Sequence, residues 1–362
     1  MHDLIQDMGK EVVKQDASSK LGQYSRLWNH EDIVNVLTTN SGSDCIKGII
    51  YPSKSLPKGF YPRKIVILKL PNGNTISLKQ PLQKFENLIC MDLSLCQQLT
   101  QIPDVSGAPN IRDLKLEGCT NLKEIQDSVG GLTKVFDLSL EECTSLEIFP
   151  HGIQMTSLRL LNFNDCRSLQ HFPDILEQMD KLKRFEARRT GIKQIPHSIC
   201  YLPGLEVLLL PHNDNLVSIP ESVNKLDRLE FFNLDNCRML QQITGIPSNL
   251  QQLQADGCIS LTSQSSNALW TQALQEVKGF SIKMPITPIP DWFDHRCKGG
   301  SLSFWVRRKF PFFAFAVVLG ESTSETSSKF GGAGVKILCY NNGHRIWSNT
   351  SFYRSSAAAA GH

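Results

Sequence analysis

An apolar pattern that repeats with a period in the low twenties constrains this chain more than any other feature. Its clearest copy starts at Val135 and has Leu138, Leu140, Cys143 and Leu146 at the fourth, sixth, ninth and twelfth positions. Successive copies start 23, 24, 23, 24, 23, 24 and 21 residues apart, at Leu88, Ile111, Val135, Leu158, Leu182, Leu205, Leu229 and Leu250. Random apolar sequence does not hold one register over eight copies. We therefore expect a solenoid in which each copy packs on its neighbours.

The order of residue types within each copy indicates which solenoid this is. The copies follow L-x-x-L-x-L-x-x-N/C-x-L, the pattern typical of leucine-rich repeats, in which each repeat contributes one strand. We predict an α/β solenoid, the leucine-rich-repeat horseshoe, over residues 45–265. A weaker copy with Ile65, Leu68 and Leu70 counts as a further repeat, and Ser55–Pro57 resembles the tail of one more. The first, fourth and sixth positions should point inward, where burial of a leucine contributes roughly 1.5–3 kcal/mol.

The two flanks of the repeats have different patterns. Residues 1–44 are predicted to form an N-terminal helical cap and a linker, with one amphipathic helix over residues 1–15 and another from Glu31 to Leu37. Helical character follows the repeats from Ala268 to Val277. An all-β, sandwich-like domain is predicted for residues 266–354 and a disordered tail for residues 355–362. The strand signals of the β domain lie at residues 280–284, 301–306, 312–319 and 335–340.

Composition and cysteine placement bear on the environment of the chain. The formal charge of +3 is nearly neutral for 362 residues and favours neither nucleic acid nor membrane as a partner. The longest apolar run, Phe312 to Leu319, is too short to cross a bilayer, and residues 1–15 contain no signal-peptide core. Six of the 11 cysteines occupy the ninth repeat position, where a small side chain can meet backbone groups. We therefore expect reduced thiols and a cytoplasmic or nuclear location.

No arrangement of residues predicts catalysis, and we expect no enzyme activity, cofactor or metal. The sequence has no G-x-x-x-x-G-K-[ST], no H-x-x-x-H and no C-x-x-C. The glycine-rich segment Gly331–Gly334 precedes a strand, so it is interpreted as a hairpin loop. Asp291, Asp294 and His295 lie close together beside aromatic residues, and we favour a surface turn over a metal site there.

A binding surface is the function that the residues themselves predict. The third, fifth and seventh positions of each repeat should face the concave side of the horseshoe. Along that side the residues are acidic in the early repeats, basic in the fifth and apolar in the next two. This order could orient and anchor a protein partner. The alternative is ordinary solvated charge, and the absence of interleaved aromatic residues argues against nucleic acid. The predicted partner-binding residues are Asp113, Glu117 and Glu141, then Arg184, Arg188 and Arg189, then Val207, Leu209 and Phe231.

Several segments in a fixed order resemble one known family. They are Met1–Gly9, Ser25–Trp28 with Glu31–Ile33, the cysteine form of the repeats as in Leu116–Cys119, the turn Ile289–Phe293, and Gly300–Phe304. Together they are similar to plant intracellular immune receptors that contain a TIR domain, a nucleotide-binding NB-ARC domain and leucine-rich repeats. Met1-His2-Asp3 resembles the MHD motif near the end of NB-ARC. The region after the repeats resembles the family's β-sandwich, called C-JID.

The resemblance implies a role in plant defence signalling. In that family the repeats and C-JID recognise a pathogen effector or a guarded host protein, the motif histidine helps to hold ADP, and the TIR domain cleaves NAD. This sequence has neither a TIR domain nor a P-loop. We therefore expect a non-catalytic recognition part in which His2 and Asp3 complete no nucleotide site, so that ADP or ATP acts only in a full-length relative. The alternative is a general leucine-rich-repeat scaffold unrelated to immunity.

Overall fold

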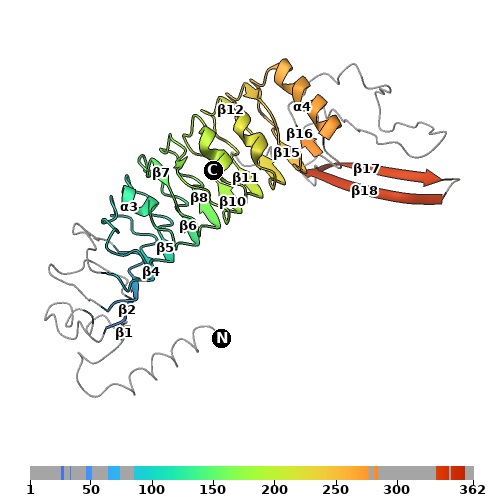
Figure 1. The fold of residues 1–362 in the computed structure, drawn as a ribbon. Helices are drawn as coiled ribbons and strands as arrows, with labels where there is room; N and C mark the ends of the chain where they lie inside the picture. The colour runs from blue at the N-terminus through green and yellow to red at the C-terminus, as the bar shows by residue number, and fades with distance from the viewer. Residues whose placement is uncertain are drawn as a thin grey trace, which may run out of the picture. The chain divides into compact units, whose positions relative to one another are not determined.

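The computed structural model describes residues 26–27, 33, 46–50, 64–73, 85–276, 281–283, 332–341 and 344–354. The chain divides into two compact units, Met1–Pro285 and Ile286–His362. The first unit is a solenoid built on one parallel sheet of 12 strands, in the order β1-β2-β3-β4-β5-β6-β8-β10-β11-β13-β15-β16 (Figure 1). This parallel solenoid confirms the repeat prediction, because each repeat supplies one strand.

The strands are short and pair in equal register. The third position of one repeat lies opposite the third position of the next, as in Arg184 opposite Val207 and Val207 opposite Phe231. Each repeat position therefore forms a continuous row across the sheet. The strands are β1 Arg26–Leu27, β2 Gly48–Ile50, β3 Ile67–Lys69, β4 Cys90–Asp92, β5 Asp113–Lys115, β6 Asp137–Ser139, β8 Leu160–Asn162, β10 Arg184–Glu186, β11 Val207–Leu209, β13 Phe231–Asn233, β15 Gln252–Gln254 and β16 Ser281–Lys283.

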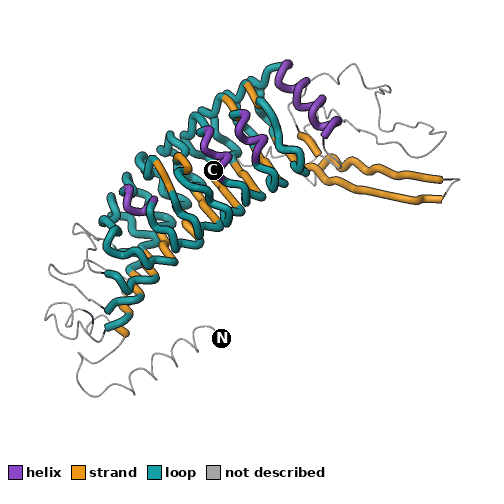
Figure 2. Tube along the Cα trace, in the orientation of Figure 1, coloured by secondary structure: helices purple, strands orange, loops and turns teal. Residues whose placement is uncertain are grey.

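The other side of the solenoid consists mostly of turns, not of the helices that an α/β solenoid would have (Figure 2). Its helical elements are short: α3 Asp127–Gly130 and the 3-10 helices η2 His197–Tyr201 and η3 Glu221–Lys225. Pro196 and Pro220, both with φ −71°, directly precede the two 3-10 helices, and proline fixes this angle. Two small parallel pairs complete this side, β7 Gly152–Ile153 with β9 Asp174–Ile175 and β12 Ser218–Ile219 with β14 Gln242–Ile243.

The core of the solenoid follows the predicted positions. Val135, Leu138 and Leu140, at the first, fourth and sixth positions of one repeat, are completely buried. Aromatic rings fill the middle of the array. Phe172 stacks on Phe185 with ring centroids 4.4 Å apart, and Phe149 meets Phe163 edge-on at 4.8 Å. Such pairs contribute about 0.5–1.5 kcal/mol beyond their burial.

The ninth-position cysteines cap backbone groups, as the sequence predicted. Each thiol donates a hydrogen bond, with a donor–acceptor distance of 3.1 Å, to the carbonyl oxygen of the sixth-position residue one repeat earlier. Burial raises the pKa of Cys143 to about 12, so this thiol stays protonated. The six residues of this thiol ladder are Cys96, Cys119, Cys143, Cys166, Cys237 and Cys258.

The eighth position turns the chain out of each strand. Its residues have φ between +54° and +72° in all nine described repeats, and only Gly118 and Gly257 are glycines. Non-glycine residues adopt this left-handed conformation at a cost, so the surrounding ladder must impose it. The other members of this row are Asn72, Leu95, Glu142, Asp165, Arg189, His212 and Asn236.

The sheet extends beyond both ends of the repeats found in the sequence. At the N-terminal end, β2 and β1 continue the sheet before Ile65, where the sequence had indicated only the tail of another copy. Of the predicted cap, Arg26–Leu27 forms a strand and Ile33 is helical and buried, while most of residues 1–44 lie outside the described residues. At the other end, β16 pairs with β15 in parallel, although residues 280–284 had been assigned to the β domain.

The region after the repeats is described only in part. Helix α4, Ser263–Glu276, confirms the predicted helix and starts before Ala268; near its start the Ser265 N–H donates to Thr262 Oγ1 at 3.2 Å. In the second unit β17, Gly332–Asn341, pairs with β18, His344–Arg354, in an antiparallel hairpin. This hairpin confirms the strand predicted at residues 335–340. The hairpin loop predicted at Gly331–Gly334 is wrong, because Gly332, Ala333 and Gly334 belong to β17 and pair with β18. The strands predicted at residues 301–306 and 312–319 lie outside the described residues, so the sandwich remains a prediction.

Candidate functional site

The candidate site is the sheet face, which we define as the third, fifth and seventh positions of the repeats that start at Ile111 through Leu229. Leu160, Arg184, Val207 and Phe231 follow one another in register across β8, β10, β11 and β13. Arg184 is exposed and the three apolar side chains are half-buried.

Leu209 lies in the neighbouring row, between Glu186 and Asn233. The equal register thus brings the predicted apolar residues together beside the basic repeat. Leu160 is not among the partner-binding residues predicted from the sequence, although it is at the third repeat position, like Arg184, Val207 and Phe231.

The basic repeat is less positive than its sequence suggests. The Arg184 Nε forms an ion pair with the Glu186 carboxylate, which also accepts a hydrogen bond from Asn164 Nδ2 at 2.7 Å. Arg188 is exposed, and its backbone N–H donates to Asn164 Oδ1 at 2.9 Å. Among the described residues no carboxylate pairs with the Arg188 side chain. Arg188 therefore carries a charge on the sheet face that no described carboxylate offsets.

Arg189 lies in the turn, not on the strand. It occupies the eighth position with φ 54°, and its guanidinium lies 3.6 Å from Asp165 Oδ1. The next residue in that row is His212, which was not predicted as a site residue. Burial lowers the pKa of His212, and the nearby charges of Arg189 and Arg188 lower it further. The lowered pKa favours the neutral imidazole, and Asp165 offsets the charge of Arg189, so this row adds little net charge beside the sheet face.

The acidic part of the sheet face lies on β5, β6 and the residues that follow them. Asp113 is half-buried and pairs in register with Asp137. The Cys90 thiol donates to Asp113 Oδ2 at 3.3 Å, and burial together with this carboxylate raises the pKa of Cys90 to about 11. Glu141 Oε2 accepts a hydrogen bond from Asn162 Nδ2 at 3.2 Å. Glu117, like Glu141, is exposed. The predicted acid-to-apolar order along the sheet is therefore present in the fold.

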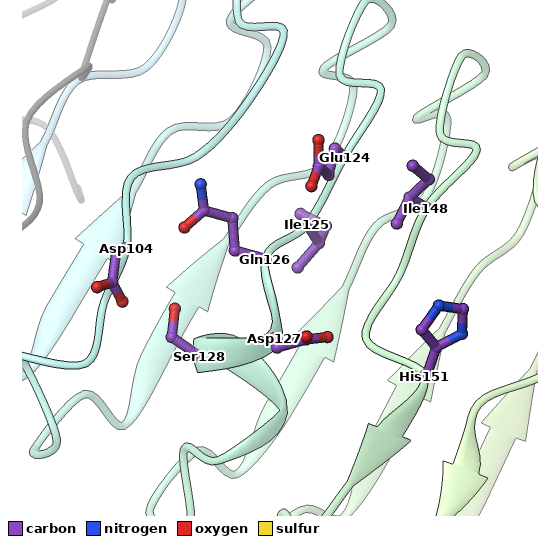
Figure 3. Close-up of a pocket in the computed structure, with 8 residues that line it drawn as sticks. All are labelled: Asp104, Glu124, Ile125, Gln126, Asp127, Ser128, Ile148 and His151. Carbon is purple, nitrogen blue, oxygen red and sulfur yellow. The ribbon is translucent and has the colours of Figure 1, made fainter.

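A shallow groove lies away from the sheet face, beside α3 (Figure 3). Asp104 accepts hydrogen bonds from the backbone and hydroxyl of Ser106, each at 2.9 Å, and these bonds lower its pKa. Ser128 Oγ accepts the Val105 N–H at 3.1 Å, and Figure 3 shows His151 on the far side of Asp127 from Ser128. The groove therefore has no nucleophile and base in contact. It is lined by Asp104, Glu124, Ile125, Gln126, Asp127, Ser128, Ile148 and His151.

The remaining predictions concern the nucleotide-motif residues, metal ligands and membrane spans. His2 and Asp3, the residues of the MHD-like motif, lie outside the described residues. Within the described ranges, no group of three or more histidine, cysteine, aspartate or glutamate side chains is arranged to hold a metal ion. In the same part of the chain, no helix has the length and apolar character needed to cross a membrane.

Comparison with known proteins gives the relationship of the chain. Residues 154–229 match the family described as "Disease resistance protein RPS4B-like, leucine-rich repeats". The chain is 28% identical over 319 residues to TMV resistance protein N of Nicotiana glutinosa, covering 74% of the chain and 28% of that protein. It is 29% identical over 292 residues to disease resistance protein RPP2B of Arabidopsis thaliana, covering 64% of the chain and 24% of that protein. The matches thus span about a quarter of each relative's length.

Among solved structures, the chain matches the leucine-rich repeat domain of the type III effector XCV3220 (XopL). Its identity is 17% and its TM-score 0.37, over 52% of this chain and 73% of that one. That similarity is too low to support a conclusion, and the fold rests on the strand register. The sequence matches, taken with the repeats in the structure, identify this chain as a leucine-rich-repeat relative of the plant disease resistance proteins.

Proposed function

We propose that the sheet face binds a protein, either a pathogen effector or a guarded host protein, in plant defence recognition. The observation that carries the proposal is the unbroken row of Leu160, Arg184, Val207 and Phe231. Apolar and aromatic side chains are the usual anchors of protein interfaces, and the neighbouring charges would orient the partner. The names of the relatives support the defence setting.

The charge pattern supports a specific role for each part of the face. Val207, Leu209 and Phe231 are half-buried, so their remaining exposed surface is held in place and loses little conformational freedom on binding. Arg188 offers an unpaired charge beside them, while Asp113, Glu117 and Glu141 lie toward the opposite end of the array. A partner with an acidic segment and an apolar segment would therefore bind in one orientation. We propose that this role is non-catalytic and belongs to the cytoplasm or nucleus.

A site-specific crosslink tests the proposal. The full chain, expressed in leaf tissue challenged with a pathogen, would carry a photoreactive phenylalanine at Leu209 or, as a control, at Tyr201, which is 49% exposed on η2. We expect a discrete protein adduct at position 209 and none at position 201. Phe231→Ala should lower its yield by roughly tenfold or more, since buried aromatic anchors contribute about 2 kcal/mol or more. Equal adducts at both positions, or an adduct insensitive to Phe231→Ala and Arg188→Glu, would contradict the proposal.

A further inference from the structure

The second repeat positions form a row of their own along one edge of the sheet, where β4, β5, β6 and β8 begin (Figure 1). The Arg112 N–H donates to the Ile89 carbonyl at 2.8 Å, the Phe136 N–H to the Arg112 carbonyl at 3.2 Å, and the Arg159 N–H to the Phe136 carbonyl at 2.6 Å. These bonds fix the four residues side by side at the spacing of neighbouring strands, about 4.8 Å. The order along the edge is apolar, cationic, aromatic, cationic.

The side chains of this row are open to solvent. Ile89 is 38% exposed and Phe136 36% exposed. Other large apolar residues of the repeats are more exposed, such as Leu176 at 60%, but Ile89 and Phe136 share one repeat position and alternate with the two arginines of the row. Arg112, Arg159 and the adjoining Lys134 are also exposed. The Arg159 guanidinium lies 5.2 Å from the centre of the Phe136 ring, a cation–π contact that holds both groups outward. We call Ile89, Arg112, Lys134, Phe136 and Arg159 the edge patch.

The edge patch is a bounded positive surface. Among the described residues, its three cations have no carboxylate partner, whereas the next cation in the row, Lys183, pairs with Glu206. Glu206 and then Glu230 continue the row, so the positive charge ends there. Asp113 and Asp137 follow Arg112 and Phe136 in the chain but belong to the sheet face, where they would repel an acidic ligand. Along β5 and β6 an acidic segment is therefore favoured at the edge patch and disfavoured on the adjoining sheet face.

The backbone groups of the row already form hydrogen bonds within the solenoid, so a partner peptide cannot bind there by adding a strand. The N–H and carbonyl groups of the row bond to neighbouring repeats from Ile89 to Gln251, so an extended peptide cannot add to this edge as a strand. Side chains must make the contacts. Three steps of the row span about 14–15 Å. Positions i, i+3, i+7 and i+10 of an α-helix lie on one face. Relative to position i, the last three rise about 4.5, 10.5 and 15 Å, which agrees to within about 1 Å with the roughly 4.8, 9.6 and 14.4 Å of the row.

We infer that the edge patch binds an amphipathic α-helix of a protein partner, with apolar residues at i and i+7 and carboxylates at i+3 and i+10. The apolar residues contact Ile89 and Phe136, and the carboxylates pair with Arg112 and Arg159. Lys134 adds charge near the middle of the helix. A nucleic acid would use the cations but leave Ile89 without a role, and a single aromatic ring offers no stacking series. This surface is separate from the sheet face of the proposed function.

The test is a titration of the full chain with a synthetic, helix-stabilised peptide of about 18 residues that carries leucine at i and i+7 and glutamate at i+3 and i+10. Fluorescence anisotropy should show saturable binding. The Arg112→Glu, Arg159→Glu double variant should weaken binding by about tenfold or more, and Phe136→Ala by about fivefold. The matched control, Lys225→Glu with Arg228→Glu, makes the same change in net charge at two exposed residues of a distant repeat and should stay within about twofold.

Three results would overturn the inference. They are no saturable binding, an unchanged affinity in the double variant, and equal binding by a peptide of the same composition in scrambled order or by a single-stranded oligonucleotide. Urea midpoints equal to that of the original chain establish that the variants are folded. Phe231→Ala on the sheet face should leave peptide affinity unchanged, so this inference and the proposed function can fail independently.

Discussion

The repeats that start at Leu182 and Leu205 differ from their neighbours at the ninth position, where Thr190 and Asn213 replace cysteine. In the cysteine repeats each thiol makes a single bond to the preceding repeat. Asn213 instead donates to the carbonyls of Ala187 and Leu210 at 2.8 and 2.9 Å, and its Oδ1 accepts from the N–H and the hydroxyl of Thr190 at 2.9 and 2.6 Å. The array therefore replaces a row of weak independent bonds with one shared network at its middle.

This difference has a bearing on the candidate site. The carbonyl that Asn213 holds belongs to Ala187, directly between Glu186 and Arg188. The same two repeats supply Arg184, Val207 and Leu209. The polar network thus fixes the backbone under the part of the sheet face where apolar and basic residues meet. A rigid support of this kind limits the entropy lost when a partner binds.

The largest expected effect comes from removing the centre of the network. Asn213→Ala leaves the Ala187 carbonyl and the Thr190 N–H without their partners in a buried site. Each such group costs about 1–3 kcal/mol, so the free energy of unfolding should fall by about 3 kcal/mol, measured by urea denaturation.

The control for this prediction restores the cysteine pattern in both repeats. Cysteine N–H groups bond to the sixth-position carbonyl of their own repeat, as Cys143 does to Leu140 at 3.0 Å. Thr190→Cys with Asn213→Cys should therefore cost about 1 kcal/mol less than the sum of the two single changes. Strict additivity would mean that the two residues do not act as a unit.

A smaller loss of stability is expected when one cysteine of the thiol ladder is replaced. Cys143→Ala removes a weak donor to the Leu116 carbonyl and a small buried volume, so the free energy of unfolding should fall by about 1 kcal/mol. The same urea experiment measures it. A loss as large as that of Asn213→Ala would show that the two kinds of ninth position are equivalent.

The smallest expected effect on the free energy of unfolding comes from protonation of His212, which adjoins Asn213 of the polar network. Because the pKa of His212 is lowered in the folded chain, its protonation opposes folding, and stability should decrease as the pH falls from about 6.5 toward the lowered pKa. The double variant Arg188→Ala, Arg189→Ala removes the two nearby positive charges and should raise the pKa of His212 part of the way toward its ordinary value. The rise is partial because burial, the main cause of the lowered pKa, remains. An NMR titration of the imidazole measures the change, and a fall in the pKa would contradict this assignment.

The sequence predicted the repeats well because their period fixes both pairing and burial. It missed β2, Gly48–Ile50, because the copy around it has Tyr51 at the sixth position and Lys54 at the ninth, where the other copies have leucine, phenylalanine or alanine and a small uncharged residue. The charge state of the basic repeat was also missed. Arg184 and Glu186 lie on the same face of a strand, so they neutralise each other, a relation that a tally of charges along the chain does not include.

The edge patch was missed for a different reason. Alternation along a strand assigns the odd positions to the sheet face, and it gives no preference for the second position, which precedes the strand. Only the backbone bonds between repeats show that Ile89, Arg112, Phe136 and Arg159 form one row. The exposure of Ile89 and Phe136 likewise depends on the turn into each strand.

Length changes in this chain are restricted to whole repeats, because every strand pairs with its neighbour in equal register. Loss of residues 135–157 would bring β5 beside β8 and place the Cys166 thiol next to the Leu116 carbonyl, which Cys143 now caps. Loss of a single residue within a strand would instead turn its leucines toward water. Insertion and deletion of repeats can therefore change which side chains are neighbours within each surface row, and so produce new binding faces, while the interior stays as it is.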